Sequence, residues 1–427
     1  MPSFPRRVLL LSALFVLSAC AVAPRPLAIT DVSVVDVEGG EILPSATVLI
    51  RNDRIVAMGT DIRVPASARR VNGAGRFLIP GLWDMHTHHQ ATGEESLPIF
   101  VALGVTGTRD MGSDASFILP LRGRVDRGEV LGPRITAAGP MLDAAPADWP
   151  WRRQVTTAEE GAQAVEELRR EGVDFIKVHD TTPREAYFAI ADAARQHGLP
   201  LVGHVPATVT VSEAVAAGQR SIEHYANFRI FSECPKSGCA ALYDSFAENQ
   251  VWQAPTLAFW STVPSLLAGE QASPSSYASP GLRKVWRENR ADGATANAIA
   301  EMGERAATKI PEMNRHKVGF LAGCDGLVPG FCLHDELERF TAAGLSPVEA
   351  LRTATINPAR YFGREASEGS VATGRRADLV ILDANPLADI RHTRRIHAVV
   401  LGGRLYDRRA LDQMLSTARE TFARSRE

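Results

Sequence analysis

The chain has 427 residues, of which 45% are hydrophobic and 22% charged, and this is enough for a large folded core. Its 47 basic and 49 acidic residues give a formal net charge of −2, which provides no electrostatic basis for binding nucleic acid. Only five of the basic residues are lysines, so the position of each lysine is informative.

Residues 1–19 have the pattern of a lipoprotein signal peptide. Two arginines precede the apolar stretch Val8–Leu17, which is too short to span a bilayer as a mature helix. The tetrad Leu17-Ser18-Ala19-Cys20 resembles a lipobox, and the residue after Cys20 is Ala21 rather than an aspartate that would favour the inner membrane. We therefore expect a lipid anchor at Cys20 and a location on the periplasmic side of the outer membrane. The alternative is an ordinary secretory signal and a secreted protein.

Both ends of the mature chain consist of short strand patterns separated by turns. At the N-terminal end these are Ala28–Asp36, Thr47–Arg51 and Arg54–Gly59, and the sequence Arg51-Asn52-Asp53-Arg54 indicates a hairpin. Similar runs lie between residues 371 and 407. We expect residues 20–76 and 366–427 to form one composite β-sandwich, which ends in an amphipathic helix from Arg408.

Between these ends, apolar strand-like runs alternate with helical patterns such as Thr157–Glu171 and Pro183–His197. The candidate strands are Phe77–His86, Val105–Met111, Arg134–Gly139, Phe175–His179, Leu201–Val205, Ser221–Tyr225, Val251–Leu257 and Val318–Asp325. Eight such alternations predict an α/β fold, a TIM-type (β/α)8 barrel over residues 77–365, with its chemistry at the C-terminal strand ends. The long stretch Ala258–Arg315 is a candidate lid.

Polar residues occupy the ends of several of these strands. His86 and His88 alternate along a strand and so face the same side, as two halves of a metal site or as hydrogen-bonded core histidines. Lys177 lies inside an apolar strand, where a lysine costs several kcal/mol unless it is paired or chemically altered. Further strands end in three more such residues, His204, His224 and Asp325. Together these residues predict a metal centre.

This set of residues resembles the metal-dependent amidohydrolase superfamily, in its imidazolonepropionase-like branch that includes Xaa-Pro dipeptidases with a carboxylated lysine. Further similar motifs are Gly203–Pro206, Ser221–His224, Ala343–Leu351, Ala354–Ala359 and Gly374–Val380. The resemblance implies that His86, His88 and Asp325 hold one metal ion. It also implies that His204 and His224 hold the other, and that Lys177, carboxylated by CO2, bridges the two.

Zinc suits these ligands, although manganese and cobalt remain open. The family mechanism implies that a metal-bridging hydroxide attacks the carbonyl and that the catalytic residue Asp325 shuttles the proton. Position 207 is alanine, where the deaminases of this branch carry a glutamate, so a mononuclear deaminase is disfavoured. The segment Met141–Trp151 is apolar and aromatic, which favours a bulky substrate.

The whole chain is similar to the bacterial ochratoxin-degrading amidohydrolases, which split ochratoxin A into ochratoxin alpha and phenylalanine. We therefore expect a binuclear hydrolase of the carboxypeptidase or N-acyl amino acid amidase type, which takes a small-molecule amide with a free carboxylate. The alternatives are hydrolysis of cyclic amides, lactones or phosphotriesters, or a non-catalytic periplasmic metal-binding lipoprotein. We also expect a homo-oligomer and no nucleic-acid partner.

Three residues are candidates for substrate contact. Tyr225 follows a predicted ligand and Arg229 lies one turn further on, and either can pair with a substrate carboxylate or pack within a loop. His179 faces the same side as Lys177, where it contacts substrate or orients the carbamate. Cys234 and Cys239 are compatible with a local disulfide or with free thiols, and Cys324 is expected to be a small core residue.

Overall fold

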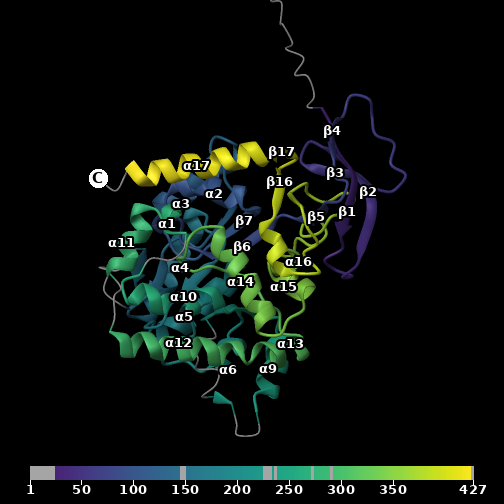
Figure 1. Ribbon diagram of the computed structural model, residues 1–427. Coiled ribbons are helices and arrows are strands. Elements are labelled where there is room, and N and C mark those ends of the chain that lie inside the picture. Colours follow the sequence, from purple (N-terminus) through teal and green to yellow (C-terminus); the bar gives the residue numbers. More distant parts are fainter. Residues whose placement is uncertain are drawn as a thin grey trace, which may run out of the picture.

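Strands from the two ends of the chain share one eight-stranded sheet, which lies at one side of the molecule (Figure 1). The computed structural model describes residues 25–144, 151–224, 233–234, 238–270, 274–288 and 292–424. The strands of this sheet are, in spatial order, β17 (Arg404–Asp407), β16 (Ile396–Leu401), β15 (Leu379–Leu382), β5 (Phe77–Pro80), β1 (Leu27–Val35), β2 (Ile42–Arg51) and β3 (Arg54–Gly59), with β4 (Arg69–Asn72) paired to β1. The antiparallel pairing of β15 with β5 joins the two chain ends. The hairpin predicted at Asn52 is present between β2 and β3.

The middle of the chain forms parallel strands, as the βαβ pattern predicts. One sheet contains β6 (Leu82–Thr87), β7 (Val105–Asp110) and β8 (Arg134–Ala137). The other contains β10 (Arg152–Gln154), β9 (Met141–Asp143), β11 (Ile176–Val178), β12 (Leu201–Gly203), β13 (Gln219–Glu223) and β14 (Trp252–Ala254). The fold is therefore α/β with parallel strands in its centre.

Two predicted strands differ from the structure. The run Phe77–His86 is divided at Gly81, so that β5 joins the sheet of chain ends and β6 joins the parallel strands. A side chain at Gly81 would lie 2.2 Å from Thr106 Oγ1, so only glycine fits at this crossing. The run Val318–Asp325 is not a regular strand. It makes one bridge, from Phe320 to Gln253, and then hydrogen-bonds beside β6.

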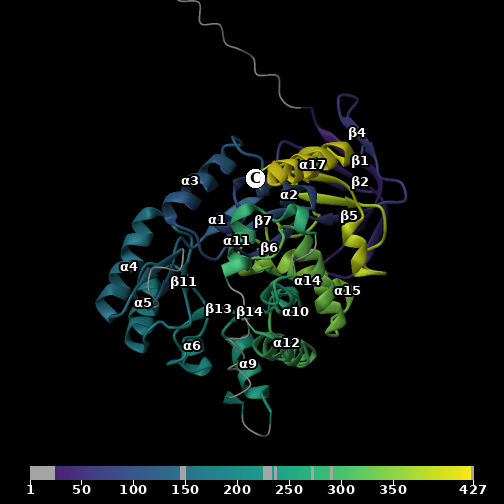
Figure 2. The same cartoon turned by 60° about the vertical axis from the view of Figure 1, so that its left-hand side comes forward.

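Helices surround the parallel strands, and Figure 2 shows α3, α4, α5 and α6 along their outer side. The helices are α1 (His89–Thr92), α2 (Leu97–Ala102), α3 (Ala115–Asp126), α4 (Ala158–Glu171), α5 (Arg184–Gln196), α6 (Val211–Ala216), α9 (Ala240–Glu248), α10 (Leu257–Leu267), α11 (Pro280–Glu288), α12 (Gly293–Ala307), α13 (Ile310–Arg315), α14 (Phe331–Ala342), α15 (Pro347–Thr353), α16 (Ile356–Tyr361) and α17 (Arg408–Arg424), with 3-10 turns at Glu94–Ser96, Ser275–Tyr277 and Ile390–Arg394. Local signals set several of these boundaries. Thr157 and Glu160 form a capping box at the start of α4, and left-handed Gly172 ends it.

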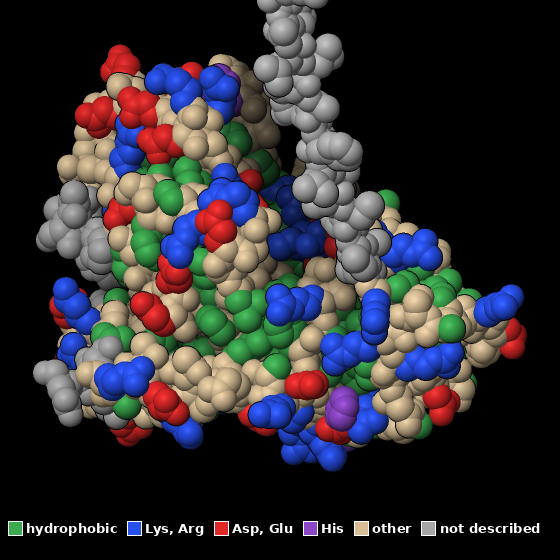
Figure 3. All heavy atoms as spheres, turned by 90° about the horizontal axis from the view of Figure 1, so that it is seen from above, with side chains coloured by type: hydrophobic (Ala, Val, Ile, Leu, Met, Phe, Trp, Pro, Cys, Tyr) green, Lys and Arg blue, Asp and Glu red, His purple; other side chains and the backbone are tan. Residues whose placement is uncertain are grey.

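The helix predicted from Arg408 is α17. Its buried residues Ala418 and Phe422 pack against Ile99 of α2, so the C-terminal segment is anchored on the central part of the fold. The face seen in Figure 3 carries basic and acidic side chains mixed among apolar ones. None of the described helices is both long enough and apolar enough to cross a lipid bilayer.

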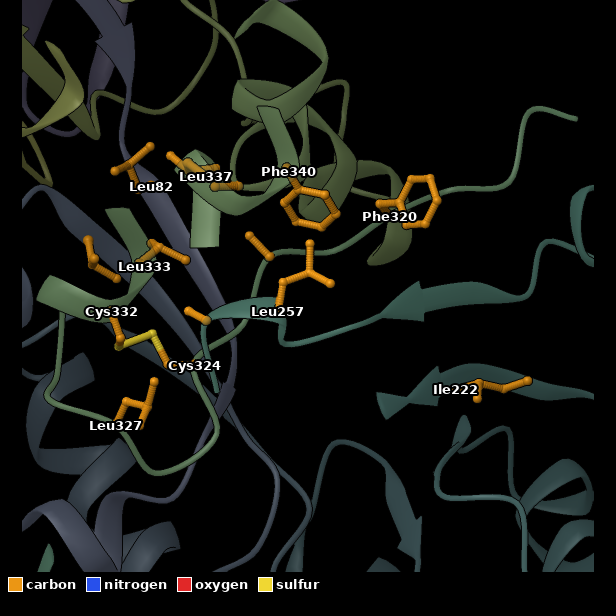
Figure 4. Close-up of a cluster of buried hydrophobic side chains, with 14 of the residues drawn as sticks. Leu82, Ile222, Leu257, Phe320, Cys324, Leu327, Cys332, Leu333, Leu337 and Phe340 are labelled. Atoms are coloured by element: carbon orange, nitrogen blue, oxygen red, sulfur yellow. A yellow bond between two sulfur atoms is a disulfide. The ribbon is translucent and has the colours of Figure 1, made fainter. Parts of the chain in front are cut away.

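Two disulfides join the four cysteines of the described residues. Cys234 pairs with Cys239, which settles the alternative left open between a disulfide and free thiols. Cys324 pairs with Cys332, so the expectation that Cys324 is only a small core residue was incomplete. Both sulfurs of this second disulfide lie among buried apolar side chains such as Leu327 and Leu333 (Figure 4). The disulfide ties the residue before Asp325 to the first turn of α14.

Candidate metal centre and substrate cavity

The six residues predicted as metal ligands converge at the C-terminal ends of the parallel strands. Asp325 stands at the centre of the group, because its Oδ1 lies 3.4 Å from Nε2 of both His86 and His88. Its Oδ2 lies 3.3 Å from Nε2 of His224. The ligand atoms of His86, His224 and Asp325 all lie within 4.8 Å of one another. This spacing is compatible with coordination of a shared cation.

Lys177 and His204 complete the group. Lys177 Nζ lies 3.4 Å from His86 Nε2, and the ring centroid of His204 lies 5.0 Å from that of His224. Lys177 is 2% exposed and forms no salt bridge with any carboxylate of the described residues. Burial lowers the pKa of Lys177 to about 8, so about a tenth of its amine is neutral at pH 7, far more than for an ordinary lysine. A neutral, buried amine is the form that reacts with CO2.

The four histidines share one hydrogen-bonding pattern that prepares them for coordination. In each ring Nδ1 donates a hydrogen bond to an acceptor outside the predicted metal centre. This leaves Nε2 facing the interior of the centre, where it can coordinate a metal ion. His86 pairs with Glu223 Oε2 at 3.0 Å, His88 with the Gly112 carbonyl at 2.9 Å, His204 with Asp180 Oδ1 at 2.8 Å, and His224 with Thr256 Oγ1 at 2.6 Å. Since the Thr256 hydroxyl donates to the Pro255 carbonyl, it accepts from His224.

The protonation states agree with this pattern. Burial lowers the pKa of His204 and of His224 to about 4, and it lowers the pKa of His86 well below its usual range. All three rings are therefore neutral at neutral pH, as metal ligands must be. Burial opposes the negative charge of Asp325, but positive charge at the position of His86 and His224 outweighs burial and holds the pKa of Asp325 well below its usual range. A divalent cation among these residues would supply that charge while the rings stay neutral. The residues present thus fit a site for divalent metal ions.

Two unusual backbone conformations help to aim the ligands. His224 and Asp325 have φ values of 56° and 48°, which are uncommon for residues other than glycine. Each ends its segment with a sharp change of direction, and the amide of Asp325 donates to the His86 carbonyl at 2.9 Å. His86 and Asp325 are 239 positions apart in the sequence, and the strand order together with these turns brings their side chains into contact.

A buried ion pair behind His86 was missed by the reasoning from sequence. Arg109 on β7 and Glu223 on β13 are both 0% exposed, and Arg109 Nη2 donates to both oxygens of Glu223 at 2.9 and 3.0 Å. Arg109 also donates to the Met85 carbonyl and to the Tyr361 hydroxyl. Part of the signal was available, because both are charged residues within predicted strands, as Lys177 is.

A cavity of about 250 Å³ lies directly beside the predicted ligands. Its remaining walls are mostly apolar and come from the stretch between β14 and the segment that ends in Asp325. The described lining residues from this stretch are Phe259, Val263, Leu266 and Leu267 of α10 and Leu282, Val285 and Trp286 of α11. Trp151 forms another wall, with its ring stacked over His88 at a centroid distance of 6.0 Å.

The three candidate substrate contacts have different outcomes. His179 lines the cavity. Tyr225 and Arg229 lie outside the described residues. The candidate lid contributes α10 and α11 to the cavity wall, and Trp286 Nε1 of α11 donates to the Gly326 carbonyl at 3.1 Å. This bond ties the wall to the residue that follows Asp325.

Known proteins with a similar sequence cover most of the chain. Ochratoxinase from Aspergillus niger is 23% identical over 90% of this chain and 87% of its own length. An adenine deaminase from Rubrobacter xylanophilus is 25% identical over 90% of this chain, which spans only 58% of the length of that enzyme.

Solved structures show the same fold. A Xaa-Pro dipeptidase with methionine bound in its active site has a TM-score of 0.72 at 20% identity, and covers 90% of this chain and 100% of its own. The structure of A. niger ochratoxinase has a TM-score of 0.68 at 20% identity, with coverage of 90% and 96%. Known structures thus combine a central α/β part with a sheet like the eight-stranded sheet formed here by the two ends of the chain.

The model of the amidohydrolase family matches residues 77–406, which contain all six predicted ligands and most of the described chain. This match and the hydrolases among the relatives agree with the resemblance drawn from the strand-end residues. The chain is a hydrolase that belongs to the amidohydrolase family.

Proposed function

We propose that this protein is a binuclear metal hydrolase that cleaves the amide bond between a large apolar acyl group and a C-terminal amino acid. The observation that carries the proposal is the apolar cavity beside a group of four imidazoles that bond outward through Nδ1, which leaves Nε2 to face Lys177 and Asp325 in the interior. In this proposal the central parallel strands belong to a closed eight-strand barrel. Ochratoxinase, the fungal relative, supports a substrate such as ochratoxin A, with phenylalanine as the leaving amino acid.

The residues would divide the work as follows. His86, His88 and Asp325 would hold one ion, and His204 and His224 the other, with the carboxylated Lys177 between them. When bound, the two ions would supply Lewis acidity to a shared water and to the scissile carbonyl, with zinc as the expected metal. Asp325 is ionised, so a carboxylate oxygen can take up the proton of the attacking water and pass it to the leaving nitrogen.

The chain also shapes the site around that reaction. The apolar side chains of α10 and α11 would surround the acyl group and exclude water from it. Burial of the acyl group would stabilise the complex by about 25 cal/mol per Å² of apolar surface. The apolar walls lower the local dielectric constant, which strengthens electrostatic interactions at the reacting carbonyl. A bulky aromatic acyl group would bury more apolar surface against these walls than a small one.

Three measurements test the proposal together. Elemental analysis of the purified protein should give two divalent ions per chain, and at most one ion would contradict the binuclear centre. N-Naphthoyl-phenylalanine should be hydrolysed faster than aromatic lactones, and the reverse order would favour a lactonase. Asp325→Asn should lose activity on both, so full activity of that variant with metal bound would overturn the role of Asp325.

We further propose export and lipidation at Cys20. The two disulfides support an oxidising compartment, because such bonds persist outside the reducing cytosol. Metabolic labelling with palmitate should modify the full chain but not the Cys20→Ala variant. Equal labelling of both would contradict the lipid anchor.

A further inference from the structure

His179 is a cavity residue that the predicted metal centre does not use. It follows β11, two positions after Lys177, and lines the same cavity. Its ring centroid lies 4.1 Å from that of His204, so it is adjacent to the centre. Its side chain is 15% exposed, which leaves the ring accessible from the cavity. These features make it available for contact with a bound substrate.

A fixed carboxylate holds one edge of this ring. His179 Nδ1 lies 3.1 Å from Oδ2 of Asp143, which is fully buried at the end of β9. Asp143 is itself held in place by two hydrogen bonds and one ion pair. The Thr181 amide and hydroxyl donate to its Oδ1 at 3.0 and 2.5 Å, and Arg152 Nη1 lies 2.8 Å from its Oδ2. An ionised carboxylate 3.1 Å from Nδ1 favours the imidazole tautomer that carries its proton on Nδ1, because two acceptors this close would repel each other. In that tautomer Nε2 carries the lone pair.

The cavity offers a substrate few other acceptors. Among its described lining residues, His179 is the one side chain outside the predicted ligand set with a nitrogen or oxygen acceptor. The two tryptophans, Trp151 and Trp286, have only N–H donors, and the other lining residues outside the ligand set are apolar or glycine. An amide N–H that enters this apolar space must find an acceptor or remain unpaired, which is unfavourable.

We propose that Nε2 of His179 accepts the N–H of the scissile amide and so makes the enzyme selective for secondary amides. This inference rests on the proposed amide hydrolysis and adds a substrate class to it. An ester or a tertiary amide, such as an amide of proline or of an N-methyl amino acid, has no N–H for this acceptor. Asp143 is the positioning residue that fixes the imidazole tautomer.

The test compares three substrates with one acyl group. They are N-naphthoyl-phenylalanine, N-naphthoyl-N-methylphenylalanine, in which the scissile amide is tertiary, and the ester of naphthoic acid with 3-phenyllactate. For each substrate, kcat/KM of the full-length protein is divided by that of His179→Leu, so that intrinsic reactivity cancels. The ratio should be about 10 to 100 for the secondary amide, the loss typical of one buried hydrogen bond, and below about 3 for the other two.

Two controls separate this role from a structural one. His179→Gln restores an acceptor near the position of Nε2 and should recover part of the activity on the secondary amide only. Metal content, measured by elemental analysis, should be the same in wild type, His179→Leu and His179→Gln.

The outcomes distinguish this inference from the proposed function. Equal losses on all three substrates, or loss of metal in His179→Leu, would overturn the acceptor role and leave amide hydrolysis standing. No hydrolysis of any of the three by wild-type protein with its metal bound would instead contradict the proposed function, and this inference with it.

Discussion

The carboxylate of Glu223 has three partners, Arg109, His86 and the Ser221 hydroxyl, and its replacement by glutamine tests the first two. It neutralises the guanidinium of Arg109 and accepts from His86 Nδ1 at 3.0 Å. All three side chains are fully buried, so no solvent is available to take over either interaction. Glu223→Gln keeps the shape of the side chain and removes only its charge. We expect it to lower both the stability of the apoprotein and the affinity for metal.

The size of each effect follows from this burial. Loss of one partner of a buried ion pair leaves an uncompensated charge, which costs about 3 to 5 kcal/mol in free energy of unfolding. Loss of a carboxylate behind a metal-binding histidine typically costs about 10- to 100-fold in metal affinity. The glutamine oxygen can still accept from His86, so we expect the lower end of that range.

Urea unfolding of the metal-free protein measures the first effect, and zinc titration with a competing chelator measures the second. The chain provides a matched control in Arg127 and Glu129, which form a two-bond pair of the same type on the surface. Glu129→Gln should change neither quantity measurably, because solvent screens an exposed pair. The double variant Arg109→Met with Glu223→Gln should regain stability but not metal affinity.

Two results would refute this reasoning. If Glu223→Gln were no more destabilising than Glu129→Gln, the buried pair would not contribute as described. If stability fell while metal affinity stayed unchanged, Glu223 would not orient His86 for coordination.

Three further predictions follow from the same site. The pKa of Lys177 is lowered to about 8, so metal-depleted protein should regain activity in bicarbonate and zinc faster at pH 8.5 than at pH 6.5, and equal rates would exclude carboxylation of its amine. Burial raises the pKa of Glu336 from 4.5 to about 8, so the folded state binds its proton more tightly than the unfolded state does. Its contribution is complete below pH 4.5 and is lost as the pH rises toward 8. Urea unfolding should therefore show a loss of about 2 to 3 kcal/mol between pH 5 and 7 in wild type relative to Glu336→Gln, and parallel pH profiles would contradict it. Val263→Trp should fill the apolar cavity and raise KM for N-naphthoyl-phenylalanine at least about tenfold while sparing N-acetyl-phenylalanine, whereas equal changes would place the acyl group elsewhere.

Much of this architecture could be predicted because strand alternation is local. The period of two along β6 places His86 and His88 on one side, and parallel strands bring their C-terminal ends to one edge. Lys177, His204 and His224 follow the same rule, so their convergence required only the number and direction of the strands. The signals that begin and end α4 are equally local. Each of these predictions uses information within a few residues.

The features that could not be predicted depend on contacts between distant segments. Arg109 and Glu223 are 114 positions apart, and nothing near either residue identifies the other. The disulfide of Cys324 needed the turn that brings Cys332 back to it. The division of the first predicted strand at Gly81 depends on Thr106 of β7, which leaves no room for a side chain. In each case the deciding partner lies in another element.

The metal centre and the substrate cavity are built from different kinds of structure, and this has a consequence for specificity. Five of the predicted ligands lie in or directly after short parallel strands, and Asp325 ends a segment beside β6. Most of the apolar wall instead comes from α10 and α11 in the long stretch before Asp325. Substitutions in those helices can therefore change the acyl group that is accepted without displacing a ligand. Trp286 is the exception, because its indole N–H donates a hydrogen bond to the carbonyl of Gly326, the residue after Asp325. Trp286→Phe should thus affect kcat through Asp325, while Val263→Trp acts on KM alone.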